Sequence, residues 1–174
     1  TNVTLTSGTL TNLYGGGNFA ATHTNNVTVN GGTVNNIFGG GNNAETTINT
    51  ILNLTNATVN DSVYAGGKLG NVTGNTYLTI KNSHITNDVY GGGDEADVIG
   101  NAYTTVTGTT SIGKSLFGGG NSGTIGNATN NNSLSVVNVT GAVIGNNVYG
   151  GSNTSVVYGT TDVNIGYDAV GNTS

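Results

Sequence analysis

Two carboxylates in this chain stand where acid–base chemistry would need them. Asp61 and Asp88 lie three and two residues before successive aromatic residues of a repeat, so the fold could bring them close together. Paired carboxylates are what glycoside hydrolases use, which makes a carbohydrate-active enzyme remnant one hypothesis. The chain has no arginine, however, and His23 and His84 have no matched serine or aspartate partner. We therefore expect surface acids at corners of the fold and no enzymatic activity.

A second acidic group, formed by Asp94, Glu95 and Asp97, follows a glycine run. Carboxylate oxygens are ligands that calcium accepts. The spacing fits neither an EF-hand loop nor the glycine-rich nonapeptide of calcium-binding β-helices. We expect a solvated corner loop here and no cofactor, with calcium as the alternative.

Aromatic residues followed by small residues form the strongest motif. The runs are Gly-Gly-Gly four times, Ala65-Gly66-Gly67 once and Gly150-Gly151-Ser152 once. Glycine permits positive φ and close backbone approach at a tight corner. Exposed rings would give a glycan chain a platform for stacking, but the free exchange of Tyr and Phe favours a packed ladder of rings. The candidate residues are Tyr14, Phe38, Tyr64, Tyr90, Phe117 and Tyr149.

The rings recur at intervals of 24, 26, 26, 27 and 32 residues, each directly after an aliphatic residue. Two further blocks recur in step with them, and both alternate with the strand period of two. The first is a pair of residues, mostly apolar, with one residue between them: Val3-x-Leu5, Val27-x-Val29, Leu52-x-Leu54, Leu78-x-Ile80, Thr104-x-Val106, Val137-x-Val139 and Val163-x-Ile165. The second is a single aliphatic: Leu10, Val34, Val59, Ile85, Ile112, Ile144 and Val170.

A looser block follows the glycines, where Val72, Ile99 and Ile125 precede Gly-Asn pairs. Together the blocks predict an all-β fold, a parallel β-helix (β-solenoid) of about six to seven coils of 24–27 residues with one longer coil. Coils of that length suit three faces, and one domain would cover residues 1–174. Frequent glycine and the lack of an i, i+3, i+4 pattern exclude helices. An antiparallel sandwich, the structural alternative, does not explain the long period.

The longest interval places an insertion near Thr129–Ser133, which we expect to bulge from one corner of the coil. Neither end of the chain carries an obvious polar cap for an open β-edge. We therefore expect a segment of a longer repeat array, with end-to-end self-association as the alternative.

The composition limits the classes of partner. Charged residues make up 6% of the chain, the net charge is −5, and the three basic residues are Lys68, Lys81 and Lys114. Nucleic-acid binding needs a clustered basic patch, so no nucleic-acid partner is expected. No apolar run is long enough to insert in a membrane. A nearly uncharged surface rich in Thr, Asn and Gly indicates an extracellular or cell-surface protein.

The residues between the paired apolar positions should face outward on one flat face. A flat threonine array would be able to bind ice, but asparagines interrupt this one, and Tyr77 and Lys81 stand in neighbouring columns. An ordinary hydrogen-bonded β-surface is favoured. The column consists of Thr4, Thr28, Asn53, Thr79, Thr105, Asn138 and Asn164.

The signature Tyr/Phe-Gly-Gly-Gly-Asn at Tyr14–Asn18, Phe38–Asn42 and Phe117–Asn121, with its flanking strands, resembles a known class of repeat. This class is the adhesin-like β-solenoid repeat of secreted or wall-attached proteins of Gram-positive and gut bacteria. The resemblance covers nearly the whole chain and implies an extracellular, passive, extended module. It carries over no catalytic or binding residue.

Three functions follow, in order of preference. The first is a non-enzymatic structural or adhesive module that forms a rigid rod outside the cell. The second is a glycan-binding solenoid that uses the aromatic column. The third is the enzyme remnant around Asp61 and Asp88. A host or matrix glycan or protein, or further repeats of the same kind, would be the partner.

Overall fold

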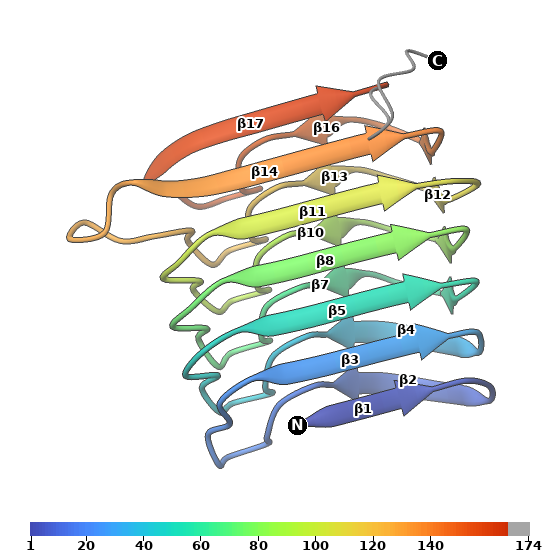
Figure 1. The fold of residues 1–174 in the computed structure, drawn as a ribbon, viewed down its shortest axis with the longest axis horizontal. Coiled ribbons are helices and arrows are strands. Elements are labelled where there is room, and N and C mark those ends of the chain that lie inside the picture. Colours follow the sequence, from blue (N-terminus) through green and yellow to red (C-terminus); the bar gives the residue numbers. More distant parts are fainter. Residues whose placement is uncertain (167–174) are drawn as a thin grey trace.

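The computed structural model describes residues 1–166 as a parallel β-solenoid of about six turns (Figure 1). The described part of the chain contains strands and no helix. The predicted all-β solenoid is therefore confirmed. Val170, the last aliphatic of the predicted series, lies outside the described residues.

One face of the rod is a parallel sheet of seven strands, with one strand from each coil. Val27 pairs with Val3 and Leu52, and Thr104 pairs with Leu78 and Val137, so the register is the one that the repeat predicted. In spatial order the strands are β1 (Asn2–Leu5), β3 (Asn25–Asn30), β5 (Thr50–Thr55), β8 (Thr76–Lys81), β11 (Ala102–Thr107), β14 (Ser133–Thr140) and β17 (Gly159–Ile165).

The opposite wall is a second parallel sheet, of ten strands. The first two coils contribute one strand each, β2 (Thr9–Tyr14) and β4 (Thr33–Phe38). Each later coil is bent in the middle of this wall and contributes two short strands. They are β6 (Thr58–Val59), β7 (Val63–Tyr64), β9 (His84–Ile85), β10 (Val89–Tyr90), β12 (Ser111–Ile112), β13 (Leu116–Phe117), β15 (Val143–Ile144) and β16 (Val148–Tyr149).

A third parallel ladder consists of single bridges, which run from Thr22 and Thr46 through Val72, Val98 and Ile125 to Val157. Val98, and not Ile99, is therefore the inward residue of the fourth coil, so the alignment predicted for this block was wrong by one residue. The reason is that Ile125 directly precedes its Gly-Asn pair, whereas Val72 stands two residues before its own.

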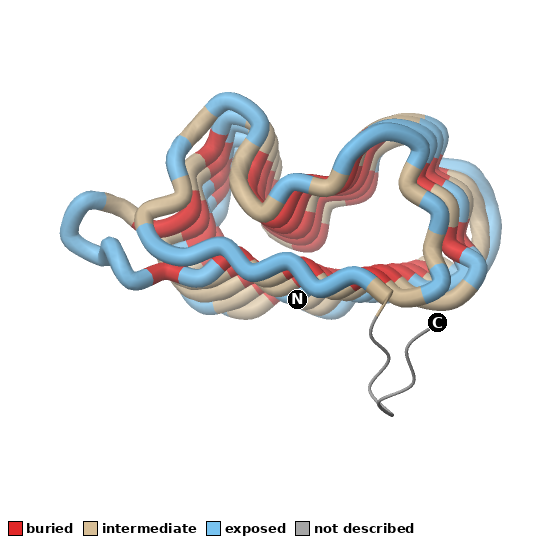
Figure 2. Tube along the Cα trace, turned by 90° about the horizontal axis from the view of Figure 1, so that it is seen from above, coloured by how far each residue is buried: buried red, intermediate tan, exposed pale blue. Residues whose placement is uncertain are grey.

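The core lies between the two sheets, where the buried positions of successive coils line up along the rod (Figure 2). Val27, Leu52, Ile80, Ile85 and Leu116 are fully buried members of it. Val72, Val98, Ala102 and Ile125 form a smaller cluster under the third ladder. Because each coil buries its apolar residues against its neighbours, the coils support one another along the axis.

The predicted insertion lies between Ile125 and β14, where a loop projects from the rod in Figures 1 and 2. Asn127 Oδ1 accepts hydrogen bonds from the backbone nitrogens of Thr129 and Asn130, at 3.0 and 2.8 Å. Asn130 Nδ2 donates to the carbonyl oxygen of Ile99 on the preceding coil, at 2.7 Å. Ser133, predicted as the end of the insertion, is the first residue of β14.

Candidate functional site

The six aromatic residues form one continuous stack along the rod. Successive ring centroids are 4.8 to 5.0 Å apart, and the ring planes differ by 4 to 11°. Each ring follows an inward aliphatic on its strand, so it points to the outer side of the wall. Phe38 is still only 4% exposed, Tyr90 5% and Phe117 7%, whereas Tyr149 in the last coil is 44% exposed. The aromatic ladder is thus packed, as the exchange of Tyr and Phe predicted.

The stack decides which parts of the rings a ligand can reach. At a centroid spacing of 4.9 Å, Phe38 covers one face of Tyr14 and Tyr64 covers the other face of Phe38. A sugar ring therefore cannot lie flat on an inner ring. On the inner rings, what a glycan could contact is limited to ring edges and to the hydroxyls of the tyrosines.

The glycine runs are required by contact between coils. A Cβ added at Gly66 would lie 2.8 Å from the backbone nitrogen of Gly93, and one at Gly40 would lie 2.7 Å from that of Gly67. None of the glycines that follow the six rings has a positive φ. The positive φ that glycine permits is therefore not used at this corner, whereas the close backbone approach is confirmed.

A column of polar residues follows the glycine runs and lies beside the rings. Asn42 Nδ2 donates to Asn18 Oδ1 at 2.8 Å, and Asn153 Nδ2 donates to Asn121 Oδ1 at 2.9 Å. Asn121 in turn donates to the Asp94 carboxylate at 2.8 Å. We name these residues the amide column; they are Asn18, Asn42, Lys68, Asp94, Asn121 and Asn153. The repeat signature includes the asparagines of this column, but sequence reasoning did not predict their hydrogen bonds between coils.

The middle of the ring stack is acidic. Burial raises the pKa of Tyr90 to about 12, and the charges of Asp88 and Asp94 add to this effect. Burial, with Asp94 as the next cause, raises the pKa of Tyr64 well above its ordinary value. Both phenols therefore hold their protons more tightly than a tyrosine in water does.

The two carboxylates proposed for catalysis are engaged in hydrogen bonds between coils. Asp61 Oδ1 accepts from Asn87 Nδ2 at 2.7 Å, and Asp88 Oδ1 accepts from the backbone nitrogen of Ser115 at 2.9 Å. Neither is hydrogen-bonded to the other. They stand in adjacent columns of the wall, because they precede their rings by different numbers of residues.

The histidines are less isolated than the sequence suggested. His23 Nδ1 lies 2.7 Å from Thr47 Oγ1, and His84 Nδ1 lies 2.7 Å from Ser111 Oγ. Both pairs join equivalent positions of successive coils and are exposed. Among residues 1–166 no carboxylate is hydrogen-bonded to either imidazole, so the third member of a nucleophilic triad is missing.

Two of the three acids proposed to bind calcium also accept hydrogen bonds from the next coil. Asp94 bonds to Asn121, and Asp97 Oδ1 accepts from the backbone nitrogen of Thr124 at 2.8 Å. Glu95 is exposed. In the described part of the chain, no three His, Asp or Glu side chains are grouped so that they could hold a metal ion.

The flat face carries its threonine and asparagine column on the outside. Asn164 Nδ2 donates to Asn138 Oδ1 at 3.1 Å across two strands. Beside the column, the rings of Tyr77 and Tyr103 stack at 5.3 Å, and each hydroxyl accepts a bond from an asparagine two residues earlier in the chain. The tyrosines interrupt the polar face, as does the neighbouring Lys81.

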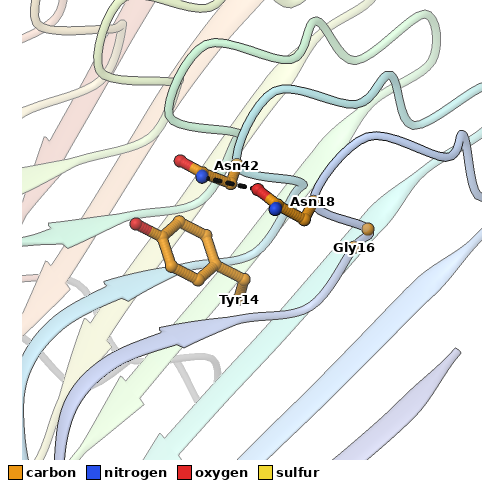
Figure 3. A pocket seen from close by; sticks show the side chains of 5 residues that line it. Tyr14, Gly16, Asn18 and Asn42 are labelled. Atoms are coloured by element: carbon orange, nitrogen blue, oxygen red, sulfur yellow. Dashed lines mark hydrogen bonds between the residues drawn. The ribbon is translucent and has the colours of Figure 1, made fainter.

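One pocket lies beside the ring column, in the first two coils (Figure 3). Its volume is about 220 Å³, and its lining residues are Tyr14, Gly16, Gly17, Asn18 and Asn42. The ring comes from the end of β2, and the two asparagines belong to the amide column. The pocket is therefore built from the same two columns that run along the rod.

Fold and site together define a non-helical repeat solenoid with a packed aromatic ladder. Comparisons with protein-family models, with curated proteins and with solved structures found no match. Residues 1–166 include no helix that could span a membrane. The functional argument therefore rests on the geometry of this chain.

Proposed function

We propose that this chain is a rigid, non-enzymatic rod that spaces or presents binding regions outside the cell. The observation that carries the proposal is the unbroken register of the seven-stranded sheet. Each strand from β1 to β17 pairs in parallel with its neighbour, residue for residue, so one hydrogen-bonded ladder spans all the coils. A continuous ladder resists bending and extension, which is what a spacer needs.

Three features of the surface support a passive role. Charge is sparse, the polar side chains are mostly Asn, Thr and Ser, and many of these side chains bond to the next coil. The acids that enzyme chemistry would use, Asp61 and Asp88, also bond to neighbouring coils. Each of these carboxylates holds two coils together through one oxygen, so a reaction at that oxygen would have to break a structural contact.

The extracellular location rests on composition. The chain has no cysteine, three lysines and no arginine, so a trypsin-like protease has few sites to cleave. Antibodies raised against the chain should label intact source cells, and a protease of broad specificity, which does not depend on lysine or arginine, should remove the label. Labelling seen only after the cells are permeabilised would contradict the proposed location.

The spacer role can be tested by removing one coil. Deleting residues 50–75 joins Asn49 to Thr76, the residue that pairs with Thr50 across the sheet. Spin labels at Thr4→Cys and Asn164→Cys, on the first and last strands, should report one narrow distance of about 29 Å for six strand spacings. The deletion should shorten it by about 4.8 Å. A broad distribution, or collapse after the deletion, would contradict a rigid spacer.

A matched control removes a length that breaks the register. Deleting residues 50–61 removes β5 and β6 but keeps β7, so only part of the third coil remains. This variant should lose the narrow distance and its cooperative unfolding. If it behaves like the whole-coil deletion, the register does not determine the length of the rod.

A further inference from the structure

One coil in the middle of the rod lacks a hydrogen bond that its neighbours make inside the core. In the third, fourth and sixth coils, an inward hydroxyl of the seven-stranded sheet donates to the carbonyl oxygen of the first small residue after the ring. The pairs are Thr50 with Ala65, Thr76 with Gly91 and Ser135 with Gly150. In the fifth coil, on β11 between β8 and β14 (Figure 1), this position holds Ala102.

Ala102 leaves a buried carbonyl without its usual donor. The column of inward residues runs through Asn25, Thr50, Thr76, Ala102, Ser135 and Thr161, and Ala102 is its one member without a polar side chain. The carbonyl that a hydroxyl would satisfy here is that of Gly118, which is buried. No group within residues 1–166 donates a hydrogen bond to this oxygen.

The same strand carries an extra hydroxyl two residues later. Thr104 holds the next inward position of β11, where the neighbouring coils have Leu78 and Val137. Its side chain is fully buried, and Thr104 Oγ1 has no hydrogen-bond partner among the described residues. A buried hydroxyl and a buried carbonyl each cost free energy when they are unpaired. The fifth coil thus loses one core hydroxyl and gains another beside it.

The two unpaired oxygens lie close to the same point. A Cβ built on Gly91 would be 2.2 Å from the carbonyl oxygen of Gly118 and 2.6 Å from Thr104 Oγ1. The two oxygens are nevertheless not hydrogen-bonded to each other. Neighbouring polar atoms without a direct bond are what a bridging water molecule joins.

The side chains of the fifth coil leave room for such a bridge. Ala102 lacks the two heavy atoms by which Thr76 is larger, and Thr104 has one heavy atom fewer than Leu78. Ile125, which packs in the same small cluster as Ala102, returns only one carbon relative to the valines of the third ladder. The register of β11 with both neighbours is unbroken, so the backbone keeps its spacing. The space that remains is comparable to one water, whose share of liquid volume is about 30 Å³.

We propose that one water molecule binds inside the fifth coil, between Thr104 and Gly118. The Thr104 hydroxyl donates to the water oxygen, and the water donates to the carbonyl oxygen of Gly118. Water thereby takes the place that the Thr76 hydroxyl has in the fourth coil, with the two polar partners that a buried water needs. The inference goes beyond the rod, because the spacer is correct or wrong whether or not this site is occupied.

The stability of Thr104→Val tests whether the hydroxyl is engaged. This variant copies Val137 of the next coil, so it should fold. If the hydroxyl holds a bridging water, its removal should raise the equilibrium constant for unfolding about fivefold or more, as measured by denaturant unfolding. A variant that is as stable as the parent chain, or more stable, would mean that the hydroxyl is unpaired, and it overturns the proposal.

A second variant removes the need for the water. Ala102→Ser copies Ser135 and gives the Gly118 carbonyl a direct donor. In this background, Thr104→Val should no longer destabilise the chain, because the bridge has been replaced. An equally large loss in both backgrounds would show that the Thr104 hydroxyl acts independently of this carbonyl, and it overturns the proposal.

NMR distinguishes a bridging water from a direct bond between Thr104 and Gly118. Magnetisation should pass from the water resonance to the methyl group of Thr104, and Ala102→Ser should abolish this transfer. The matched control is the methyl group of Thr76, whose hydroxyl bonds directly to Gly91 and should show no transfer. Equal transfer at both threonines reports only hydroxyl exchange. That result, or no transfer at Thr104, overturns the proposal.

Discussion

The hydroxyl of Thr76 donates a hydrogen bond of 2.5 Å to the carbonyl oxygen of Gly91, across the interior of its own coil. The same bond recurs at 2.6 Å from Thr50 to Ala65 and from Ser135 to Gly150. This carbonyl belongs to the first small residue after the ring, and no backbone nitrogen donates to it. A hydroxyl inside the core thus satisfies a polar group that the glycine corner leaves unpaired.

Replacing this hydroxyl should destabilise the rod without changing its shape. Thr76→Val keeps the volume but leaves the Gly91 carbonyl unpaired in the core, which should lower the free energy of unfolding by about 1–3 kcal/mol. Denaturant unfolding followed by circular dichroism measures the loss. Thr79→Val, on the exposed side of the same strand, is the control and should change stability little. If both variants lower the free energy of unfolding equally, the buried hydrogen bond makes no specific contribution to stability.

The middle glycine of the runs should be intolerant of any side chain. In Gly66→Ala the new Cβ would meet the backbone of Gly93 at 2.8 to 2.9 Å, so neighbouring coils would have to separate. We expect a loss of about 1–3 kcal/mol. Gly151→Ala changes the equivalent position in the last coil, where a Cβ meets nothing within 4 Å, and should be neutral. Thermal unfolding of the two variants compares them directly.

A left-handed turn follows each strand of the flat face, and two coils place asparagine there. Asn56 has a φ of 53° where later coils have Gly108 and Gly141 with φ values of 68 and 71°. Asn56→Gly should therefore be tolerated, while Asn56→Ala should cost about 1–2 kcal/mol.

Asn82, with a φ of 50°, occupies the same turn position and has an additional role. Its Oδ1 accepts a bond from the backbone nitrogen of Thr109 at 3.1 Å. Asn82→Gly should therefore be more costly than Asn56→Gly in the same unfolding assay. The reverse order would contradict a role for that bond.

High pH should weaken the rod through its buried phenols. The folded pKa of Tyr90 lies at about 12, above its ordinary value of 10.0, and that of Tyr64 is raised as well. The folded state holds these protons more tightly than the unfolded state does. The stability that the two phenols contribute is therefore fully present below about pH 10, and it is lost as the pH rises through the folded pKa. Unfolding curves measured across this range should show the decline.

The double variant Tyr64→Phe Tyr90→Phe is the control for this decline. It keeps the ring stack, since Phe38 and Phe117 already occupy the same column. It should flatten the loss of stability at alkaline pH. An unchanged decline would assign the sensitivity to other groups.

Calcium should leave the stability unchanged. Asp94 and Asp97 already bond to the fifth coil, and no described cluster gathers three acids. The melting temperature should be the same with millimolar calcium and with a chelator. A melting temperature that rises with calcium in the parent chain, but not in the Asp97→Asn variant, would establish a metal site.

The sequence predicts what repeats at a fixed place in every coil. The pairing of Val89 and Tyr90 with Val63 and Tyr64 follows from column matching, and even Thr104 falls into its apolar column. The bond from Thr76 to Gly91 does not follow in this way, because it joins two different columns within one coil. The hydrogen bonds of the amide column are equally hidden, because the repeat signature puts Asn18 and Asn42 at the same position of the coil but does not say that one donates to the other.

The loop before β14 gives the rod a place to accept foreign sequence. Its base is tied to the preceding coil by the bond from Asn130 to Ile99, and β14 resumes the register at Ser133. A peptide inserted between Asn131 and Asn132 would therefore extend away from the axis. Each doubling of loop length costs only about 0.6 kcal/mol in closure entropy. The solenoid would then serve as an engineering scaffold that displays an epitope at a fixed height along its axis.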